Sequence, residues 1–309
     1  MSMALSPKRN GQNPHVIVAQ RAPAGVETVH RQPMRYFDAR IIENRALGND
    51  YFVLRLGGCD PLAGSRPGQF VMLRGDWGRD PLLPRPISLL SVAPEGRADL
   101  LAKGVGRGTT LLESSQPGDR VSVLGPLGNG FPDAGPETLD LLVAGGVGLP
   151  PLFMQAEHTA RRGLIERCEM IYGGRTSRDL VLLAEMRGLG LGAHLATEDG
   201  SVGRRGRVTS SLEARIDHHV ASGRNLKLRI MACGPKEMLW AVARIAEASN
   251  IECYLSLEAH MACGIGVCLG CAVPAHSRPY RYTCNDGPVF LASDLVIPPT
   301  TGSSTRSTT

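Results

Sequence analysis

Residues 139–162 read LDLLVAGGVGLPPLFMQAEHTARR. The first six residues are apolar except for Asp140, which is typical of a strand buried on both faces of a parallel sheet. A glycine-rich turn follows, and Leu152–Arg162 is compatible with a helix. A buried strand, a glycine turn and a helix in this order predict the first unit of a doubly wound α/β domain.

The alternation of strands and helices continues after this unit. Apolar runs bounded by turn residues alternate with segments of helical period, which favours further strand–helix units. The strands are expected at Glu169–Tyr172, Ala193–Ala196 and Leu228–Ala232, and the helices near Asp179–Met186, Thr209–Ile216 and Pro235–Ala248. We therefore assign residues 134–250 to the α/β domain.

Residues 34–133 have a different pattern, with short β-rich runs separated by Gly, Pro or Asp and no long helix between them. This pattern predicts a small antiparallel β-barrel. Its strands are expected at Arg35–Ile42, Tyr51–Leu56, Gln69–Leu73, Ile87–Val92, Asp99–Ala102 and Arg120–Leu124. Turn residues cluster at Phe131–Glu137 and mark the boundary between the two domains.

The remaining segments lie at the ends of the chain. Residues 1–33 have no sustained periodicity and predict a flexible extension, and residues 298–309 form a Ser/Thr-rich tail that we expect to be disordered. Residues 251–297 begin with a strand-like run to Leu257 and continue with cysteine-rich sequence, which predicts a small third lobe. A chain of 309 residues is long enough for two domains and such a lobe.

Composition excludes several classes of protein. The net charge of +5 comes from 34 basic and 29 acidic residues, without a basic block interleaved with aromatic residues, so nucleic acid is not an expected partner. The apolar stretch from Leu141 to Phe153 is broken by glycines and prolines and cannot span a bilayer of about 30 Å as a helix. Residues 1–25 contain no apolar core of a signal peptide. We expect a cytoplasmic protein.

Four of the eight cysteines form a C-x4-C-x2-C-x12-C pattern at Cys263, Cys268, Cys271 and Cys284. The first three match the plant-type ferredoxin run, in which a tight loop wraps a 2Fe-2S cluster. Glycines at 264, 266 and 270 permit that close wrapping. Zinc is the alternative, although all-cysteine zinc sites usually contain two C-x2-C pairs and this pattern contains one. The last spacing is shorter than in plant ferredoxins, so the fourth thiolate must arrive on a compact hairpin.

The other four cysteines are dispersed. Cys59, Cys168 and Cys253 are expected to be small buried hydrophobic residues. Cys233 ends an expected strand and is followed by Gly234 and Pro235, at the carboxyl edge of the sheet where ligands bind in this architecture. For Cys233 both a structural thiol and a ligand contact stay open.

Two segments of the barrel have a pattern suited to a pyrophosphate. Arg85, Pro86, Ile87 and Ser88 begin one strand, and the run Lys103-Gly-Val-Gly-Arg-Gly-Thr109 opens a helix-compatible segment. The amides of Gly108 and Thr109 at a helix N-terminus can bind two oxygens, and Arg85 can supply a planar bidentate contact. Taken alone, the Arg-Pro pair is also compatible with a surface turn.

The turn Gly145-Gly146-Val147-Gly148 lies between an expected strand and an expected helix, which is the context in which a glycine-rich turn approaches a nucleotide. It departs from the G-x-G-x-x-G pattern, so a plain strand-to-helix turn is the alternative. Arg175 and Arg178 are candidates for a ribose or 2′-phosphate contact, and the sequence alone leaves NAD and NADP open. Asp199, Arg204 and Arg205 are interpreted as a solvated loop.

In this order, the segments resemble the ferredoxin-NADP reductase superfamily. With the cysteine pattern added, residues 34–297 look like the electron-transfer subunits of dihydroorotate dehydrogenase B. The resemblance implies FAD, a 2Fe-2S cluster and NAD as cofactors. It also implies an oxidoreductase subunit that takes electrons from an FMN-bearing dihydroorotate dehydrogenase catalytic subunit in a heterotetramer, within pyrimidine (UMP) biosynthesis.

The resemblance also implies a role for individual residues. FAD would be held by Arg85, Pro86, Ile87, Ser88, Leu101, Ala102, Lys103, Gly108 and Thr109, and NAD by Gly145, Gly146, Val147, Gly148, Cys233, Gly234 and Pro235, with Cys233 near the nicotinamide. Many relatives have Tyr at the position of Ile87, and Ile or Tyr at the position of Ala102, so aliphatic packing replaces stacking on the flavin ring here.

Two rival interpretations remain at this stage. The first is a ferredoxin-reductase-like subunit of a sulfide dehydrogenase or of an NADH-dependent bifurcating complex, which would share the same motifs. The second is a non-catalytic, zinc-binding scaffold protein. Iron, sulfide, zinc and flavin content would separate the second from the others.

Overall fold

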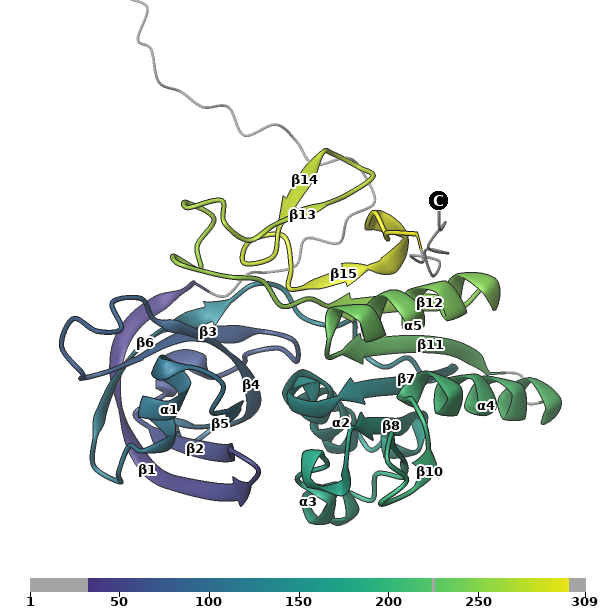
Figure 1. Ribbon diagram of the computed structural model, residues 1–309, viewed down its shortest axis with the longest axis horizontal. Helices are drawn as coiled ribbons and strands as arrows, with labels where there is room; N and C mark the ends of the chain where they lie inside the picture. Colours follow the sequence, from purple (N-terminus) through teal and green to yellow (C-terminus); the bar gives the residue numbers. More distant parts are fainter. Residues whose placement is uncertain (1–32, 224–225, 300–309) are drawn as a thin grey trace, which may run out of the picture. The chain divides into compact units, whose positions relative to one another are not determined.

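The structure is a computed structural model that describes residues 33–223 and 226–299 (Figure 1). The extension expected at residues 1–33 and the tail expected at 298–309 lie almost entirely outside the described residues.

The N-terminal domain is a closed antiparallel barrel with the strand order β1-β2-β5-β4-β3-β6. Its strands are β1 (Arg35–Gly48), β2 (Tyr51–Gly57), β3 (Phe70–Gly75), β4 (Arg85–Ala93), β5 (Arg97–Lys103) and β6 (Arg120–Leu127). A turn of 3-10 helix, η1 (Asp60–Leu62), follows β2, and helix α1 (Arg107–Glu113) lies between β5 and β6. Alternate strand residues such as Phe52, Leu54 and Val123 fill the interior. The predicted barrel is confirmed.

The second domain contains a seven-stranded sheet with the order β10-β9-β8-β7-β11-β12-β15, parallel except for β15. The strands are β7 (Thr138–Gly145), β8 (Cys168–Gly174), β9 (Ala193–Thr197), β10 (Arg204–Arg205), β11 (Lys227–Cys233), β12 (Glu252–Ser256) and β15 (Val289–Leu291). Short 3-10 turns, η2 (Gly146–Gly148), η3 (Ile165–Arg167) and η4 (Ser177–Asp179), connect these elements, and η5 (Ala292–Asp294) follows β15.

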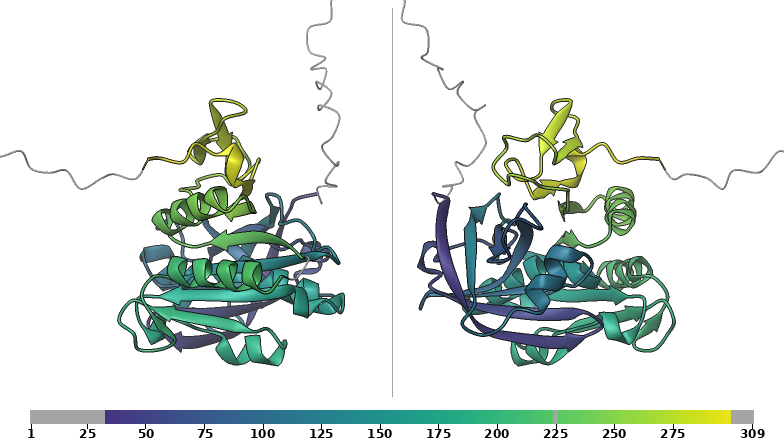
Figure 2. Two further views of the ribbon diagram at one scale, coloured as in Figure 1. Left: turned by 90° about the vertical axis from the view of Figure 1, so that its right-hand side faces the viewer. Right: turned by 60° about the vertical axis from the view of Figure 1, so that its left-hand side comes forward.

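Helices cover both faces of this sheet (Figures 1 and 2). Helices α2 (Pro150–Arg161) and α3 (Leu183–Gly188) belong to the core on one face, and α4 (Val208–Ala221) and α5 (Lys236–Ala248) to the core on the other. The doubly wound arrangement is therefore confirmed. The order reverses at β7, which has β8 on one side and β11 on the other.

The helix expected near Asp179–Met186 is only partly present. The chain forms η4, continues without helical structure from Leu180, and starts α3 at Leu183 after Leu182 takes a left-handed φ of 60°. The reason is the buried hydroxyl of Tyr172, which lies 3.0 Å from the Asp179 carbonyl oxygen and accepts a hydrogen bond from Val181 N at 3.3 Å. These backbone groups are therefore bonded to a side chain of β8 where periodicity alone predicts a continuous helix.

The cysteine-rich segment is less separate from the sheet than its expected boundary at residue 251 implies. Strand β12 extends the sheet, and β15 pairs with it through Tyr254 and Leu291. Between them lies a two-stranded hairpin, β13 (Ala272–Pro274) and β14 (Tyr280–Tyr282). Composition could not show this, because β15 lies more than thirty residues after its partner strand β12 in the sequence.

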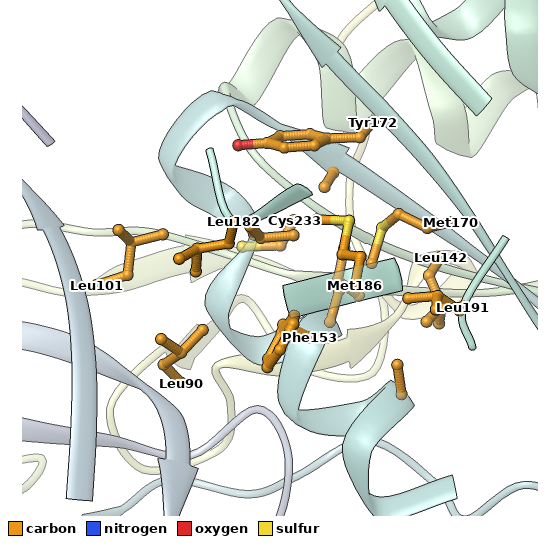
Figure 3. Close-up of a cluster of buried hydrophobic side chains, with 14 of the residues drawn as sticks. Leu90, Leu101, Leu142, Phe153, Met170, Tyr172, Leu182, Met186, Leu191 and Cys233 are labelled. Atoms are coloured by element: carbon orange, nitrogen blue, oxygen red, sulfur yellow. The ribbon is translucent and has the colours of Figure 1, made fainter. Parts of the chain in front are cut away.

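One hydrophobic core joins the barrel to the sheet. Leu90 and Leu101 of the barrel belong to the same buried cluster as Phe153 and Cys233 of the α/β domain (Figure 3). The cluster also includes Tyr172, whose ring lies above the other labelled side chains in this view. Because the two domains share this core, ligand sites at their boundary are built from both.

Candidate functional site

The site begins where β7 and β11 end side by side, with Ala144 opposite Cys233 in the register. This is the point at which the strand order reverses, and ligands of open α/β sheets bind at such a point. A Cβ atom at Gly148 would lie 2.4 Å from the carbonyl oxygen of Cys233, so the glycine turn packs backbone against backbone. A Cβ atom at Gly234, which has φ of +155°, would lie 3.0 Å from Gly145 Cα.

A cavity of about 630 Å³ opens at this edge of the sheet. Of the residues predicted to contact NAD, Gly145, Gly146, Val147, Gly234 and Pro235 line it. Gly148 is not among the lining residues; it packs against the backbone of Cys233. Arg175 lines the cavity, whereas Arg178, Arg204 and Arg205 are not among the lining residues. The sequence analysis missed several lining residues: Tyr51, Asp179, Glu198, Arg207, Thr209 and Met238.

A second cavity, of about 210 Å³, lies against the barrel. Its walls include most of the residues predicted to contact FAD: Pro86, Ile87, Ser88, Leu101, Ala102, Lys103 and Thr109. Cys233 lines this cavity rather than the larger one. Phe70, Met261 and Pro288 also line it and were not predicted, because they come from three separate segments, and Val105 lines it from within the predicted run Lys103–Thr109.

Arg85 and Gly108 lie beside the smaller cavity and in contact with each other. A Cβ atom at Gly108 would lie only 2.2 Å from Arg85 Nε, so the guanidinium occupies the space that a side chain would take. Arg85 makes one long hydrogen bond to described residues, from Nη1 to the Pro84 carbonyl at 3.5 Å. Thr109 Oγ1 accepts hydrogen bonds from Val105 N and Gly106 N, both at 3.1 Å, and so shapes the first turn of α1.

The two cavities adjoin, because Lys103, Val147 and Glu258 line both. Desolvation by the surrounding protein raises the pKa of Glu258. Burial, and then the negative charge of Glu258, raise the pKa of the Cys233 thiol. Cys233 is therefore a neutral thiol at the flavin-side wall, which favours a packing role over a nucleophilic one.

The four clustered cysteines form two pairs. Cys263 and Cys268 are adjacent, with Cys268 N donating to Cys263 Sγ at 3.3 Å, and Cys271 Sγ lies 3.2 Å from Cys284 Sγ. Burial alone would raise the pKa of Cys263, but hydrogen bonds from the backbone amides of Ile265 and Cys268 lower it to about 6. Gly266 N donates to Cys284 Sγ at 3.1 Å, although burial and then the neighbouring Cys271 thiol raise the pKa of Cys284 to about 12. Amides that point at sulfur favour thiolates, the form that binds metal.

This donor set fits a two-iron cluster. Two pairs of thiols can provide two ligands for each of two irons. The hairpin β13–β14 brings Cys284 back to Cys271, as the short last spacing requires.

The cysteine loop packs on the barrel. Cys271 and Cys284 share a buried cluster with Phe70, Met72 and Leu127. A Cβ atom at Gly264, which has φ of +72°, would lie 2.6 Å from Met72 Cγ. Glycine is required here both for the left-handed backbone and for the close approach.

Comparison with known proteins supports this assignment of the segments. Residues 258–296 match the model of the iron-sulfur cluster binding domain of dihydroorotate dehydrogenase B, and residues 142–244 that of the oxidoreductase NAD-binding domain. The dihydroorotate dehydrogenase B (NAD(+)) electron transfer subunit of Geobacillus kaustophilus is 39% identical over 275 residues, which cover 87% of this chain and all of that protein. The chain belongs to this family of electron transfer subunits. The corresponding subunit of Clostridium acetobutylicum is 35% identical over 234 residues, covering 75% of this chain and 87% of that one.

Solved structures of ferredoxin reductases have a similar fold. An NADH-dependent reduced ferredoxin-NADP oxidoreductase, studied for electron bifurcation, matches with a TM-score of 0.71 at 26% identity, over 84% of this chain and 90% of that one. A carbazole 1,9a-dioxygenase ferredoxin reductase shares the fold, with a TM-score of 0.60 at 24% identity over 71% of this chain and 67% of that one. The resemblance, fold class and oxidoreductase assignment made from the sequence are confirmed. Among the described residues, no helix has the length and apolarity needed to cross a membrane.

Proposed function

We propose that this chain relays electrons from an FMN-bearing dihydroorotate dehydrogenase catalytic subunit to NAD⁺, in pyrimidine biosynthesis. The names of its relatives support the activity, and the two subunits are proposed to form a heterotetramer. We also propose a cytoplasmic location, because a reducing compartment keeps clustered cysteines available for metal. The proposed units are the barrel (34–133), the nucleotide domain (134–250) and the cluster lobe (251–297).

The observation that carries this proposal is the contiguity of three binding regions. The flavin-side cavity shares Lys103, Val147 and Glu258 with the nucleotide-side cavity. On its other side it is lined by Phe70, which packs in the same cluster as Cys271. Phe70 thus links the thiols to the flavin-side cavity, and the three shared residues link that cavity to the nucleotide-side cavity.

Residues of the barrel are proposed to bind FAD. Arg85 and the amides of Gly108 and Thr109 are proposed to bind the pyrophosphate, because a guanidinium and the free amides of a first helical turn both favour anions. The walls formed by Pro86, Ile87, Ser88, Leu101, Ala102 and Lys103 are proposed to enclose the flavin ring. Since Ile87 and Ala102 are aliphatic and buried, they pack against a ring face without stacking on it.

Residues at the sheet edge are proposed to bind NAD, and the cysteine loop to bind the cluster. The backbone can approach the dinucleotide closely at the turn formed by Gly145, Gly146, Val147 and Gly148. Beside this turn, at the end of the neighbouring strand β11, lie Cys233, Gly234 and Pro235. Cys263, Cys268, Cys271 and Cys284 would ligate a 2Fe-2S cluster. When bound, flavin exchanges two electrons with nicotinamide and single electrons with an iron-sulfur centre.

The test is a comparison of the chain alone with its complex. Co-expression with a dihydroorotate dehydrogenase catalytic subunit should give a complex that reduces NAD⁺ with dihydroorotate, whereas the isolated chain should oxidise NADH with ferricyanide but not use dihydroorotate. Cys268→Ser should remove the cluster and the dihydroorotate-linked reaction while the flavin remains bound and NADH oxidation with ferricyanide survives. Reduction of NAD⁺ by dihydroorotate with the isolated chain would refute the division of labour.

A control separates loss of the cluster from disturbance of the loop. Val267 is adjacent to Cys268 and 73% exposed, so Val267→Ser changes the same loop without removing a thiol. It should retain iron, sulfide and the dihydroorotate-linked activity. If Val267→Ser loses them as fully as Cys268→Ser, the loss in Cys268→Ser does not identify a ligand.

A further inference from the structure

Asp179 is a buried carboxylate at the point where the barrel meets the nucleotide domain. Its side chain accepts hydrogen bonds from Asn49 Nδ2 at 2.8 Å and from Thr176 N at 3.2 Å. Lys103 Nζ lies 3.4 Å from the same oxygen that Asn49 contacts. Asn49 and Lys103 belong to the barrel and Asp179 to η4 of the second domain, so one carboxylate joins the two domains.

Lys103 is held on a second side by Tyr51. Its ammonium lies 4.3 Å from the centroid of the Tyr51 ring, within the range of a cation–π contact. Burial, and then the negative charge of Asp179, raise the pKa of the Tyr51 phenol to about 12, so the phenol stays neutral beside the ammonium. The side chains of Lys103 and Asp179 are 16% and 6% exposed, so solvent screens their interaction only weakly.

The hydroxyl of Tyr172 holds the backbone of Asp179 in place. The hydroxyl of Tyr172 lies 3.0 Å from the Asp179 carbonyl oxygen and 3.2 Å from that of Gly146, and it accepts a hydrogen bond from Val181 N. The glycine turn and η4 are therefore bonded to the same phenol. Figure 3 shows Tyr172 at the edge of the shared core, with its hydroxyl directed away from the packed side chains.

These contacts place one cation at a defined point. Lys103 lines both cavities, whereas the other two cations on the nucleotide-side wall, Arg175 and Arg207, have exposed side chains. An ammonium has three donors, and the long contact to Asp179 uses one of them. The remaining donors are available to an anionic or carbonyl-bearing ligand at the junction.

We propose that Asp179 is a positioning residue for nucleotide binding, which holds the Lys103 ammonium against Tyr51 at the junction of the two cavities so that the cation meets the dinucleotide. The inference rests on the proposed function, because it assumes that the larger cavity binds NAD(H). Asp179 acts on the dinucleotide through Lys103, and the ring of Tyr51 contacts the same ammonium. Their effect is on binding of the dinucleotide more than on affinity for flavin.

The experiment uses the full chain with its cofactors and measures NAD⁺ binding by titration calorimetry, together with KM and kcat for NADH oxidation by ferricyanide. Asp179→Asn and Lys103→Met should each weaken NAD⁺ binding about tenfold, the effect of one lost charge-assisted contact. KM should rise more than kcat falls. The double variant should be no weaker than Lys103→Met, since the two residues act as one unit.

The chain offers a matched control. Glu185 of α3 pairs with Arg45 of β1 at 2.8 Å, so it also joins the two domains, but it is outside both cavities. Glu185→Gln should bind NAD⁺ as wild type does. A further readout is the phenol of Tyr51, whose pKa is raised to about 12 by burial and then by Asp179; this pKa should fall in Asp179→Asn, as measured by ultraviolet difference titration against Tyr51→Phe.

The outcomes are distinct. If wild type binds neither FAD nor NAD⁺, the proposed function fails. If wild type binds both and Asp179→Asn matches Glu185→Gln, the positioning role is overturned. Additive losses in the double variant would also overturn it. Should Asp179→Asn fail to fold, Asn49→Ala removes the 2.8 Å bond to the same oxygen and should weaken NAD⁺ binding in the same direction; unchanged binding in that variant would count against the proposal.

Discussion

Replacement of Gly108 by alanine should weaken FAD binding although it favours the helix. Gly108 is the second residue of α1, where alanine is better than glycine by up to about 1 kcal/mol. The new Cβ, however, would lie 2.2 Å from Arg85 Nε and 3.0 Å from Arg85 Cζ. Because Nε joins the guanidinium to the rest of the Arg85 side chain, the whole guanidinium must move to make room for the new Cβ.

The magnitude follows from the contact that Arg85 is proposed to make. A hydrogen-bonded guanidinium on a phosphate contributes about 1.5 to 3 kcal/mol, which corresponds to a change in Kd of about 10- to 150-fold. Gly108→Ala should therefore approach the effect of Arg85→Ala. At Gly106, one residue before α1, an added Cβ would have no atom within 4 Å, so Gly106→Ala adds a methyl group near the same turn without displacing Arg85.

The assay is FAD affinity from flavin fluorescence, with the melting temperature of the flavin-free chain as a check on folding. We expect a weakened Kd for Gly108→Ala and an unchanged or raised melting temperature. Gly106→Ala should stay within about threefold of wild type, allowing for its poorer helix cap. Wild-type affinity in Gly108→Ala would refute the proposed position of Arg85. Equal weakening in Gly106→Ala would show that the turn, and not the guanidinium, was disturbed.

Three further predictions concern the core and the titrating groups. Gly148→Ala should lower the free energy of unfolding by more than about 2 kcal/mol in urea titrations, because the new Cβ would meet the backbone of Cys233. Gly188→Ala has open space around its Cβ and should change the free energy of unfolding by less than about 1 kcal/mol. The raised pKa of Glu258 means that the folded chain binds this proton more tightly than the unfolded chain. The protonated carboxyl therefore stabilises the folded state fully below about pH 4.5, and this stabilisation is lost as the pH rises through the folded pKa. Glu258→Gln should therefore gain stability relative to wild type between pH 5 and pH 8; a constant difference would contradict this. Burial raises the pKa of three dispersed thiols to about 12: those of Cys59, Cys168 and Cys253. Iodoacetamide at about pH 8 should therefore leave them unlabelled in the folded chain, as measured by peptide mass spectrometry. Rapid labelling would show that they are accessible thiolates.

The sequence predicted those features that depend on neighbours in the chain. The barrel strands follow from alternation between turn residues, and the cysteine loop from a spacing that spans only 22 residues from Cys263 to Cys284. Several residues that line the nucleotide-side cavity could not be found in this way. Tyr51, Asp179 and Glu258 lie on three different segments, and only closure of the barrel against the sheet brings them to one place. Helical periodicity also failed after Asp179, where the hydroxyl of Tyr172 from a distant strand bonds backbone groups that a helix would use.

The two thiol pairs face different surroundings, and this gives the proposed relay a direction in space. Cys271 and Cys284 are buried against Phe70, which also lines the flavin-side cavity. Cys268 is exposed, and the apolar side chains nearest to it in the sequence, Val267 and Leu269, are 73% and 52% exposed. Exposed apolar residues clustered beside a redox site are typical of a surface that binds another protein. One pair therefore faces inward to the proposed flavin and the other outward to the proposed catalytic subunit, so that a single cluster can contact both without movement of either domain.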